Sequence, residues 1–128
     1  MSLASTTYFR FGQNAEELFL AETDPQRQKE LRKVAGQNYF YAAMEAIEWK
    51  LKKVGIDLYS INSHRERLDI VKRNSSQFKD CVNLILKFEI LINYDYRRKV
   101  TYKGENGNKF LIVKELAQIC QKEIEDEA

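Results

Sequence analysis

The chain has few of the residues that turn or cross-link small folds. Its 128 residues include five glycines, one proline and two cysteines. So few turn-forming residues argue against an all-β chain, which needs a turn about every ten residues. Cys81 and Cys120 each lie within an apolar helical pattern, so we expect small core residues rather than a disulfide framework. Such thiols suit a reducing, cytoplasmic setting.

Histidine is also rare in this chain, and the net charge is small. His64 is the one histidine, and together with two separated cysteines it does not give the ligand spacing of a zinc site, so we expect no metal. No glycine-rich phosphate loop follows a strand, and no cofactor is expected. The 21 Lys and Arg against 19 Asp and Glu give a net charge of +2, too small to indicate a nucleic-acid protein through its overall field. An anionic partner would therefore have to bind a local basic patch.

Long apolar runs are missing as well. Nowhere do eighteen apolar residues follow one another, and the start "MSLASTTYFRFGQN" has no basic region followed by an unbroken apolar run. We therefore expect neither a membrane span nor a secretion signal. A length of 128 residues with 44% hydrophobic residues suits one domain over residues 1–128 with a real core.

Most of the chain follows a helical period. Residues 1–13 are expected to be extended or disordered and to precede a short helix over residues 14–22. Asp24 as N-cap and Pro25 at the first helical position then open a long helix, which Gly55 ends as a C-terminal cap. One stripe of this helix is expected to be buried: Phe40, Ala43, Met44, Ile47, Leu51 and Val54.

A third helix is expected to start near His64. Ser63 is a good N-cap residue, and Glu66 follows it at the spacing of a capping box. This helix would bury Leu68 and Val71 and end near Asn74.

Two further helices complete the expected fold. Ser75 or Ser76 would cap a very apolar helix that continues through Tyr102 and buries the stripe Phe78, Val82, Ile85, Phe88 and Ile92. Asn108 would cap the last helix, whose acidic end "EIEDEA" suits a solvated terminus. This last helix would bury Phe110, Val113, Leu116, Ala117, Cys120 and Ile124. The expected fold class is all-α, an up-and-down bundle of four to five helices.

The stretch most suggestive of function is "YDYRRKVTY", residues 94–102. On a continuous helix, Arg98 shares a face with both Tyr94 and Tyr102. Arg97 and Arg98 on adjacent columns would hold a phosphate by forked hydrogen bonds while a tyrosine ring stacks on a base. Alternatively, the two arginines only favour the negative C-terminal end of the helix. Both interpretations stay open.

Three segments, "YFYAAMEAIEWKLKKVG", "SHRERLDIV" and "RRKVTY", resemble in order and spacing the HEPN superfamily of prokaryotic helical domains. The resemblance covers about a hundred residues, from Asn38 to Ile119. The family's motif is an arginine followed, four to six residues later, by a histidine. Here Arg97 aligns with the arginine, and Tyr102 stands at the position of the histidine.

Active members of that family cut RNA without a metal, with the arginine and histidine paired across a homodimer interface. The resemblance therefore implies a homodimer in which Arg97 binds phosphate. Tyr102 would have to replace an acid and base that titrates near neutrality, and a tyrosine pKa of about 10 weakens proton transfer. The main hypothesis is a non-enzymatic HEPN-like domain that presents Arg97, Arg98, Tyr94 and Tyr102 to RNA, a nucleotide or a partner protein. The resemblance implies a defence or toxin–antitoxin setting.

Two other functions stay open. An active metal-independent ribonuclease would use Arg97 with Tyr102, or with His64 if that side chain folds back to supply the missing base. His64 would otherwise be an ordinary, partly exposed residue at a helix start. The last alternative is a plain protein-interaction bundle in which the arginines only finish a helix. Trp49 would lie either in a dimer interface or within its own bundle.

Overall fold

The structure is a computed structural model that describes residues 3–59, 61–93 and 107–125. Within these ranges the secondary structure is entirely helical, which confirms the all-α prediction. Its elements are α1 (Leu3–Ala21), α2 (Pro25–Lys53), α3 (His64–Arg73), a short 3-10 turn (Ser75–Gln77), α4 (Cys81–Asn93) and α5 (Gly107–Glu125). None of the helices in the described ranges is long and apolar enough to cross a lipid bilayer.

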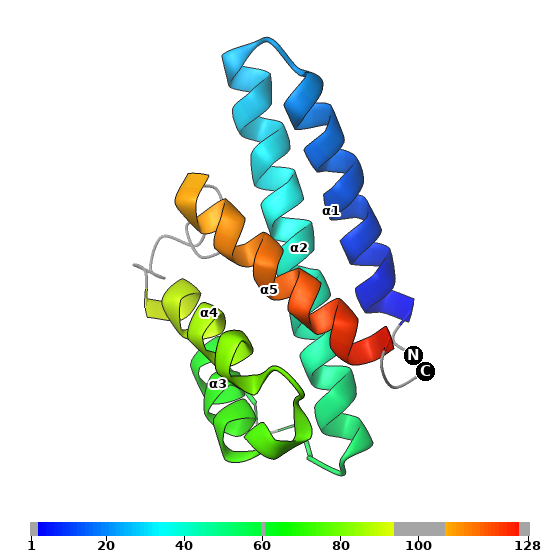
Figure 1. Cartoon of the computed structure of the whole chain (residues 1–128), viewed down its shortest axis with the longest axis vertical. Coiled ribbons are helices and arrows are strands. Elements are labelled where there is room, and N and C mark those ends of the chain that lie inside the picture. The colour runs from blue at the N-terminus through cyan, green and yellow to red at the C-terminus, as the bar shows by residue number, and fades with distance from the viewer. Residues whose placement is uncertain (1–2, 60, 94–106, 126–128) are drawn as a thin grey trace.

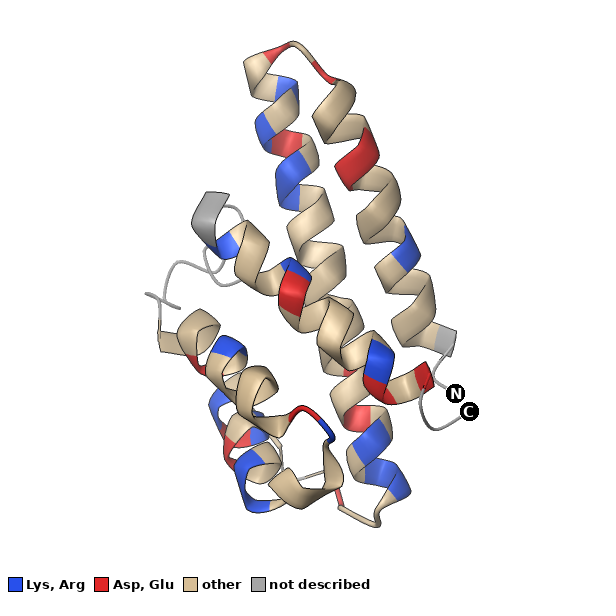
Figure 2. Ribbon diagram, viewed as in Figure 1, with Lys and Arg blue, Asp and Glu red and all other residues tan. Residues whose placement is uncertain are grey.

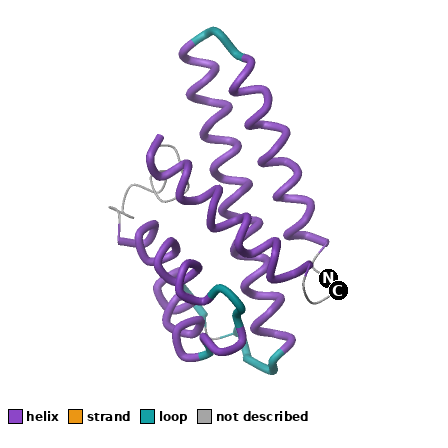
Figure 3. The backbone as a smooth tube through the Cα atoms, viewed as in Figure 1, coloured by secondary structure: helices purple, strands orange, loops and turns teal. Residues whose placement is uncertain are grey.

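Helix α2 is the central element of the bundle. It forms a long antiparallel hairpin with α1, and α5 crosses it obliquely (Figure 1). The shorter helices α3 and α4 pack on one another, and α4 also packs on α5. Short loops join α1 to α2 and α3 to α4 (Figure 3). The core lies where α2, α4 and α5 meet, and its fully buried large side chains include Phe40, Leu84, Phe88 and Leu116.

The prediction that residues 1–13 are extended or disordered, with a first helix only over residues 14–22, is wrong. Helix α1 begins at Leu3 and runs to Ala21. The reason is a buried polar contact that hydrophobic periodicity does not reveal. The Ser5 hydroxyl donates to the Ala42 carbonyl at 2.7 Å and accepts from the Gln121 side-chain amide at 2.7 Å. Three helices are thereby tied together, and each buried polar group gains a partner.

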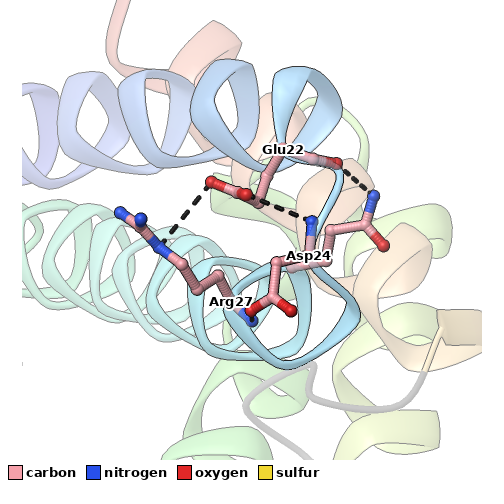
Figure 4. Close-up of polar contacts among 4 residues, drawn as sticks. Glu22, Asp24 and Arg27 are labelled. Carbon is pink, nitrogen blue, oxygen red and sulfur yellow. Dashed lines mark hydrogen bonds and ion pairs between the residues drawn. The ribbon is translucent and has the colours of Figure 1, made fainter.

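The predicted start of α2 is confirmed in detail. The Asp24 carboxylate accepts the backbone N–H of Arg27 at 3.1 Å, and Pro25 is the first helical residue. The Glu22 carboxylate in turn accepts the Asp24 N–H at 3.1 Å and lies 3.7 Å from Arg27 Nε (Figure 4). These contacts fix the turn between α1 and α2.

The other end of α2 also follows the sequence. Gly55 has a φ of +89°, the left-handed conformation that favours glycine just beyond a helix. The predicted stripe is buried from Phe40 to Leu51, but Val54 is 37% exposed. Including Val54 was wrong, because it is the capping residue and lies beyond the core.

The predicted start of α3 is confirmed as well. The Ser63 hydroxyl accepts the Glu66 N–H at 3.1 Å, while the Glu66 carboxylate accepts the N–H of Asn62 at 3.0 Å, one residue earlier than a standard capping box. Leu68 and Val71 are fully buried, as expected.

The boundaries and the buried face of α4 differ from the prediction. Residues 75–77 form a 3-10 turn, and α4 begins only at Cys81 instead of after Ser75 or Ser76. Phe78 is therefore buried although it lies outside α4, and its position does not determine which face of α4 is buried. The buried face is Leu84, Phe88, Leu91 and Ile92, and Val82, predicted to be buried, is 74% exposed.

Helix α5 buries every residue predicted for it, from Phe110 to Ile124. It begins at Gly107, so Asn108 is its second residue, and the prediction of Asn108 as its cap is wrong. The acidic end is not simply solvated either. Glu123 is only 5% exposed, and its buried charge is compensated by an ion pair with Lys50 of α2 at 3.3 Å.

Candidate functional site

The side chains of the predicted cluster, Tyr94, Arg97, Arg98 and Tyr102, lie outside the described residues. The predicted continuation of α4 beyond Asn93 lies outside them too. The structure describes both flanks of this segment, α4 up to Asn93 and α5 from Gly107. The candidate site is therefore built from these flanks and from the elements that contact them.

The two flanks border one shallow groove. Its lining residues come from the last turns of α4 and the first turn of α5: Leu86, Glu89, Ile90, Asn93 and Lys109. The groove has a volume of about 440 Å³ and is largely open to solvent. We call it the end groove. Residues 94–106 directly follow Asn93, which lines the groove. They end before Gly107, which is two residues before the lining residue Lys109.

Helix α3 adds a basic side chain at the same place. Arg65 Nη2 donates to Asn93 Oδ1 at 2.5 Å, which fixes the first turn of α3 beside the last turn of α4. This contact joins residues that are 28 positions apart in the sequence. No local pattern could have indicated it, although the basic character of "SHRER" was visible.

Near the contact between Arg65 and Asn93, carboxylates pair with some of the basic side chains but not with all of them. Arg67 forms an ion pair with Glu48 at 2.5 Å, and Lys72 pairs with Glu89 at 3.3 Å. Arg65, by contrast, binds a neutral amide, so that contact leaves its positive charge in place. Figure 2 shows the basic residues on α3 beside the end of α4. The N-terminal end of α5 adds the partial positive charge of a helix dipole.

His64 is held by contacts with its own helix and with α2. Its Nδ1 lies 2.7 Å from Arg67 Nη1, and its ring packs T-shaped on that of Phe40 at a centroid distance of 5.0 Å. A guanidinium can only donate, so Nδ1 accepts and the proton of a neutral ring lies on Nε2. That His64 approaches Arg97 or Tyr102 stays a prediction.

Trp49 lies within the bundle's own packing. It is partly buried against the hydrophobic core, and Lys53 Nζ lies 4.9 Å from the centroid of its ring. The described residues contain no group of three His, Cys, Asp or Glu side chains that could hold a metal ion.

Two further titratable groups belong to the core. Burial, reinforced by the hydrogen bond to Glu16, raises the pKa of the Tyr39 phenol. Burial, with a smaller effect of the Glu123 charge, raises the pKa of the Cys120 thiol. Neither group is prepared for proton transfer near neutral pH.

The two cysteines are expected to differ strongly in reactivity. Cys81 is half-buried and Cys120 is fully buried. The thiolate is the reactive form, so burial and a raised pKa both protect Cys120. In a Cys81→Ser variant, Ellman's reagent should modify Cys120 about 1,000-fold or more slowly than it modifies Cys81 in a Cys120→Ala variant. Equal rates would contradict the burial of Cys120.

Comparison of the chain with protein-family models, with curated proteins and with solved structures gives no match.

Proposed function

We propose that this chain is a non-enzymatic, HEPN-like helical domain that binds the phosphate groups of RNA or a nucleotide, in a prokaryotic defence or toxin–antitoxin setting. The ligand would bind between the end groove and the basic cluster of residues 94–102. The observation that carries this proposal is the hydrogen bond between Arg65 and Asn93. It places a third arginine one residue from the start of the cluster.

Chain length supports the convergence of these arginines. Arg97 and Arg98 follow Asn93 by four and five residues, which span at most about 14 and 18 Å, so a short length of chain tethers both arginines to Asn93 and its partner Arg65. Three guanidiniums within reach of one place, with Lys109 in the adjoining groove, suit an anion that takes several forked hydrogen bonds. A tyrosine from the cluster would stack on a base.

The contacts of His64 favour binding over catalysis. A general base needs an available lone pair, and the Nδ1 lone pair of His64 already accepts from Arg67. His64 would have to leave both Arg67 and the ring of Phe40 before it could take a proton from a substrate. Tyr102 is the remaining candidate, and its ordinary pKa of about 10 makes it a weak base at neutral pH.

The test is the double substitution Arg97→Ala with Arg98→Ala. Binding of labelled single-stranded RNAs and nucleotides is measured by fluorescence anisotropy at several salt concentrations. We expect affinity to fall at least about tenfold, since each lost hydrogen bond to a charged group costs about 1.5–3 kcal/mol. With RNA, the slope of log K against log salt should also fall by about 1.4, the value for two lost phosphate contacts.

A matched control removes two positive charges elsewhere. Lys29 and Lys52 are exposed near opposite ends of α2, so the Lys29→Ala, Lys52→Ala variant has the same net charge as the test variant. It should bind nearly as wild type does. Equal losses in both variants, or no loss in either, would overturn the proposal. RNA cleavage in EDTA that disappears in Arg97→Ala would instead establish a metal-independent ribonuclease.

A further inference from the structure

Two side chains of α3 connect this helix to α2. Arg67 Nη2 donates to Glu48 Oε1 at 2.5 Å, and the ring of His64 packs on that of Phe40 at a centroid distance of 5.0 Å. Otherwise α3 packs chiefly on α4. The orientation of the first two turns of α3 relative to α2 therefore depends strongly on these two contacts.

The two contacts are themselves joined by a hydrogen bond. His64 Nδ1 accepts from Arg67 Nη1 at 2.7 Å, so one guanidinium contacts Glu48 and His64 at the same time. The Arg67 side chain is 13% exposed, and its Nε is buried without a hydrogen-bond partner among the described residues. Because a guanidinium is planar and rigid, contacts at both of its terminal nitrogens fix its orientation. A change at Glu48 is thereby transmitted to His64.

Arg65 lies on the other side of the same two turns. It comes two residues before Arg67, which is about 200° around a helix, so the two arginines point to opposite sides of α3. Arg67 faces α2, whereas Arg65 reaches the end of α4, where its Nη2 lies 2.5 Å from Asn93 Oδ1. Any rotation of these turns that moves Arg67 also moves Arg65 relative to the end groove.

We propose that Glu48 is a positioning residue of the phosphate site. It acts through Arg67 and His64, and it keeps Arg65 beside the end groove. This inference rests on the proposed function, in which Arg65 contributes to the binding of phosphate. Glu48 does not bind the ligand, since its own negative charge repels an anion. Its geometric effect on affinity is therefore opposite in sign to its Coulomb effect.

The same contacts require a neutral His64. A guanidinium can only donate, so a protonated Nδ1 would face another donor and a second positive charge. The charged neighbours of His64 on α3 are Arg65, Glu66 and Arg67, and α2 contributes Glu48 through its ion pair with Arg67. Protonation of His64 is therefore expected to break its contact with Arg67 and to release the first turn of α3.

The first test is a double-mutant cycle. Binding of a fluorescently labelled oligouridylate without a terminal phosphomonoester is measured by anisotropy. Glu48→Gln should weaken binding by about three- to thirtyfold, although the loss of a carboxylate would by itself strengthen the binding of an anion. In an Arg65→Ala background, Glu48→Gln should have no further effect, because the residue through which it acts is gone. Equal losses in both backgrounds would show a general structural effect and overturn the proposal.

A matched control removes one carboxylate elsewhere on α2. Glu30 is exposed in the N-terminal half of that helix, and Glu30→Gln changes the net charge by the same amount as Glu48→Gln. The Glu30→Gln variant should bind at least as tightly as wild type. A loss of affinity in Glu30→Gln as large as that in Glu48→Gln would overturn the proposal.

The second test is the dependence of affinity on pH. His64 is the one histidine of the chain, so a change between about pH 7.5 and 5.5 reports chiefly on this residue. Wild-type affinity should fall at least about threefold as the pH is lowered. His64→Asn keeps an acceptor but cannot be protonated, and its affinity should stay constant. A wild-type affinity that rises at low pH would show that His64 acts only as an added cation, and would overturn the proposal.

Hydrogen exchange without ligand separates this inference from the proposed function. The Arg67 N–H donates to the Ser63 carbonyl at 3.1 Å, and in Glu48→Gln it should exchange at least about fivefold faster, while the amides of α5 keep their rates. If the Arg97→Ala, Arg98→Ala variant loses RNA binding but Glu48→Gln changes neither binding nor exchange, the positioning role is overturned and the proposed function stands. If the double variant binds as wild type does, the proposed function fails, and the exchange rate of the Arg67 N–H still decides whether Glu48 holds the first turns of α3.

Discussion

Replacing Glu123 by alanine is expected to destabilise the fold by about 3–5 kcal/mol, because it removes the carboxylate that forms an ion pair with the buried Lys50 ammonium. Both side chains of this pair are only 5% exposed. Glu123 also accepts the backbone N–H of Asp80 at 3.0 Å, so the variant loses an acceptor for a second group. Urea unfolding followed by circular dichroism measures the change in the free energy of unfolding.

Two comparisons separate the buried pair from ordinary surface electrostatics. Glu89→Ala breaks the ion pair between Glu89 and Lys72, two side chains that are each about 40% exposed. This variant should lose no more than about 1 kcal/mol of stability. A Lys50→Met, Glu123→Gln double variant removes both charges and keeps an acceptor for the Asp80 N–H. It should be more stable than Glu123→Ala. A loss for Glu123→Ala no larger than that for Glu89→Ala would contradict the burial of the pair.

Replacing Gly12 by valine is expected to destabilise the fold by about 3 kcal/mol or more, and replacing it by alanine by about 1–3 kcal/mol. A Cβ at residue 12 would lie 2.8 and 2.9 Å from two ring carbons of Tyr39. That ring cannot easily move, because its hydroxyl donates to Glu16 at 2.6 Å and the ring packs against those of Phe9 and Phe110 at centroid distances of 5.5 and 6.0 Å. Glycine to alanine within a helix would otherwise stabilise by about 1 kcal/mol, so the expected sign is reversed.

The control for this prediction is the neighbouring exposed residue. Gln13→Ala should change stability by less than about 0.5 kcal/mol. Combining Gly12→Ala with Tyr39→Leu should cost less than the sum of the two single variants, because the smaller side chain leaves room for the new methyl group. If Gly12→Ala stabilised the protein, the close approach of α1 and α2 would be refuted.

Local signals in the sequence predicted much of the fold. The cap at Asp24 and Pro25, the cap at Ser63 and the turn at Gly55 depend on contacts within a few residues. They could be recognised because each cap is a contact between residues close in the sequence and does not depend on the packing of the other helices. The buried set of α5 was predicted for a similar reason, since its apolar period is strong.

The missed features have a different physical origin. Helix α1 has a buried side built from Ser5, Gly12 and Ala15, which leave only a weak apolar stripe but allow close packing on α2. Apolar residues surround α4 on most sides, so its pattern did not select a buried face. The short turn before α4 then determined where the helix begins and which of its faces is buried. Val82 is therefore exposed and Leu84 is buried.

By itself, the sequence determined that this chain is helical and where α2 and α3 begin and end, because caps and helical periods are local properties. Only the tertiary structure decided which faces of α1 and α4 are buried and which distant polar side chains meet. The pairs Lys50–Glu123 and Arg65–Asn93 join residues 73 and 28 positions apart. Such contacts depend on how helices cross and rotate against one another, and those quantities are set by the packing of the whole bundle.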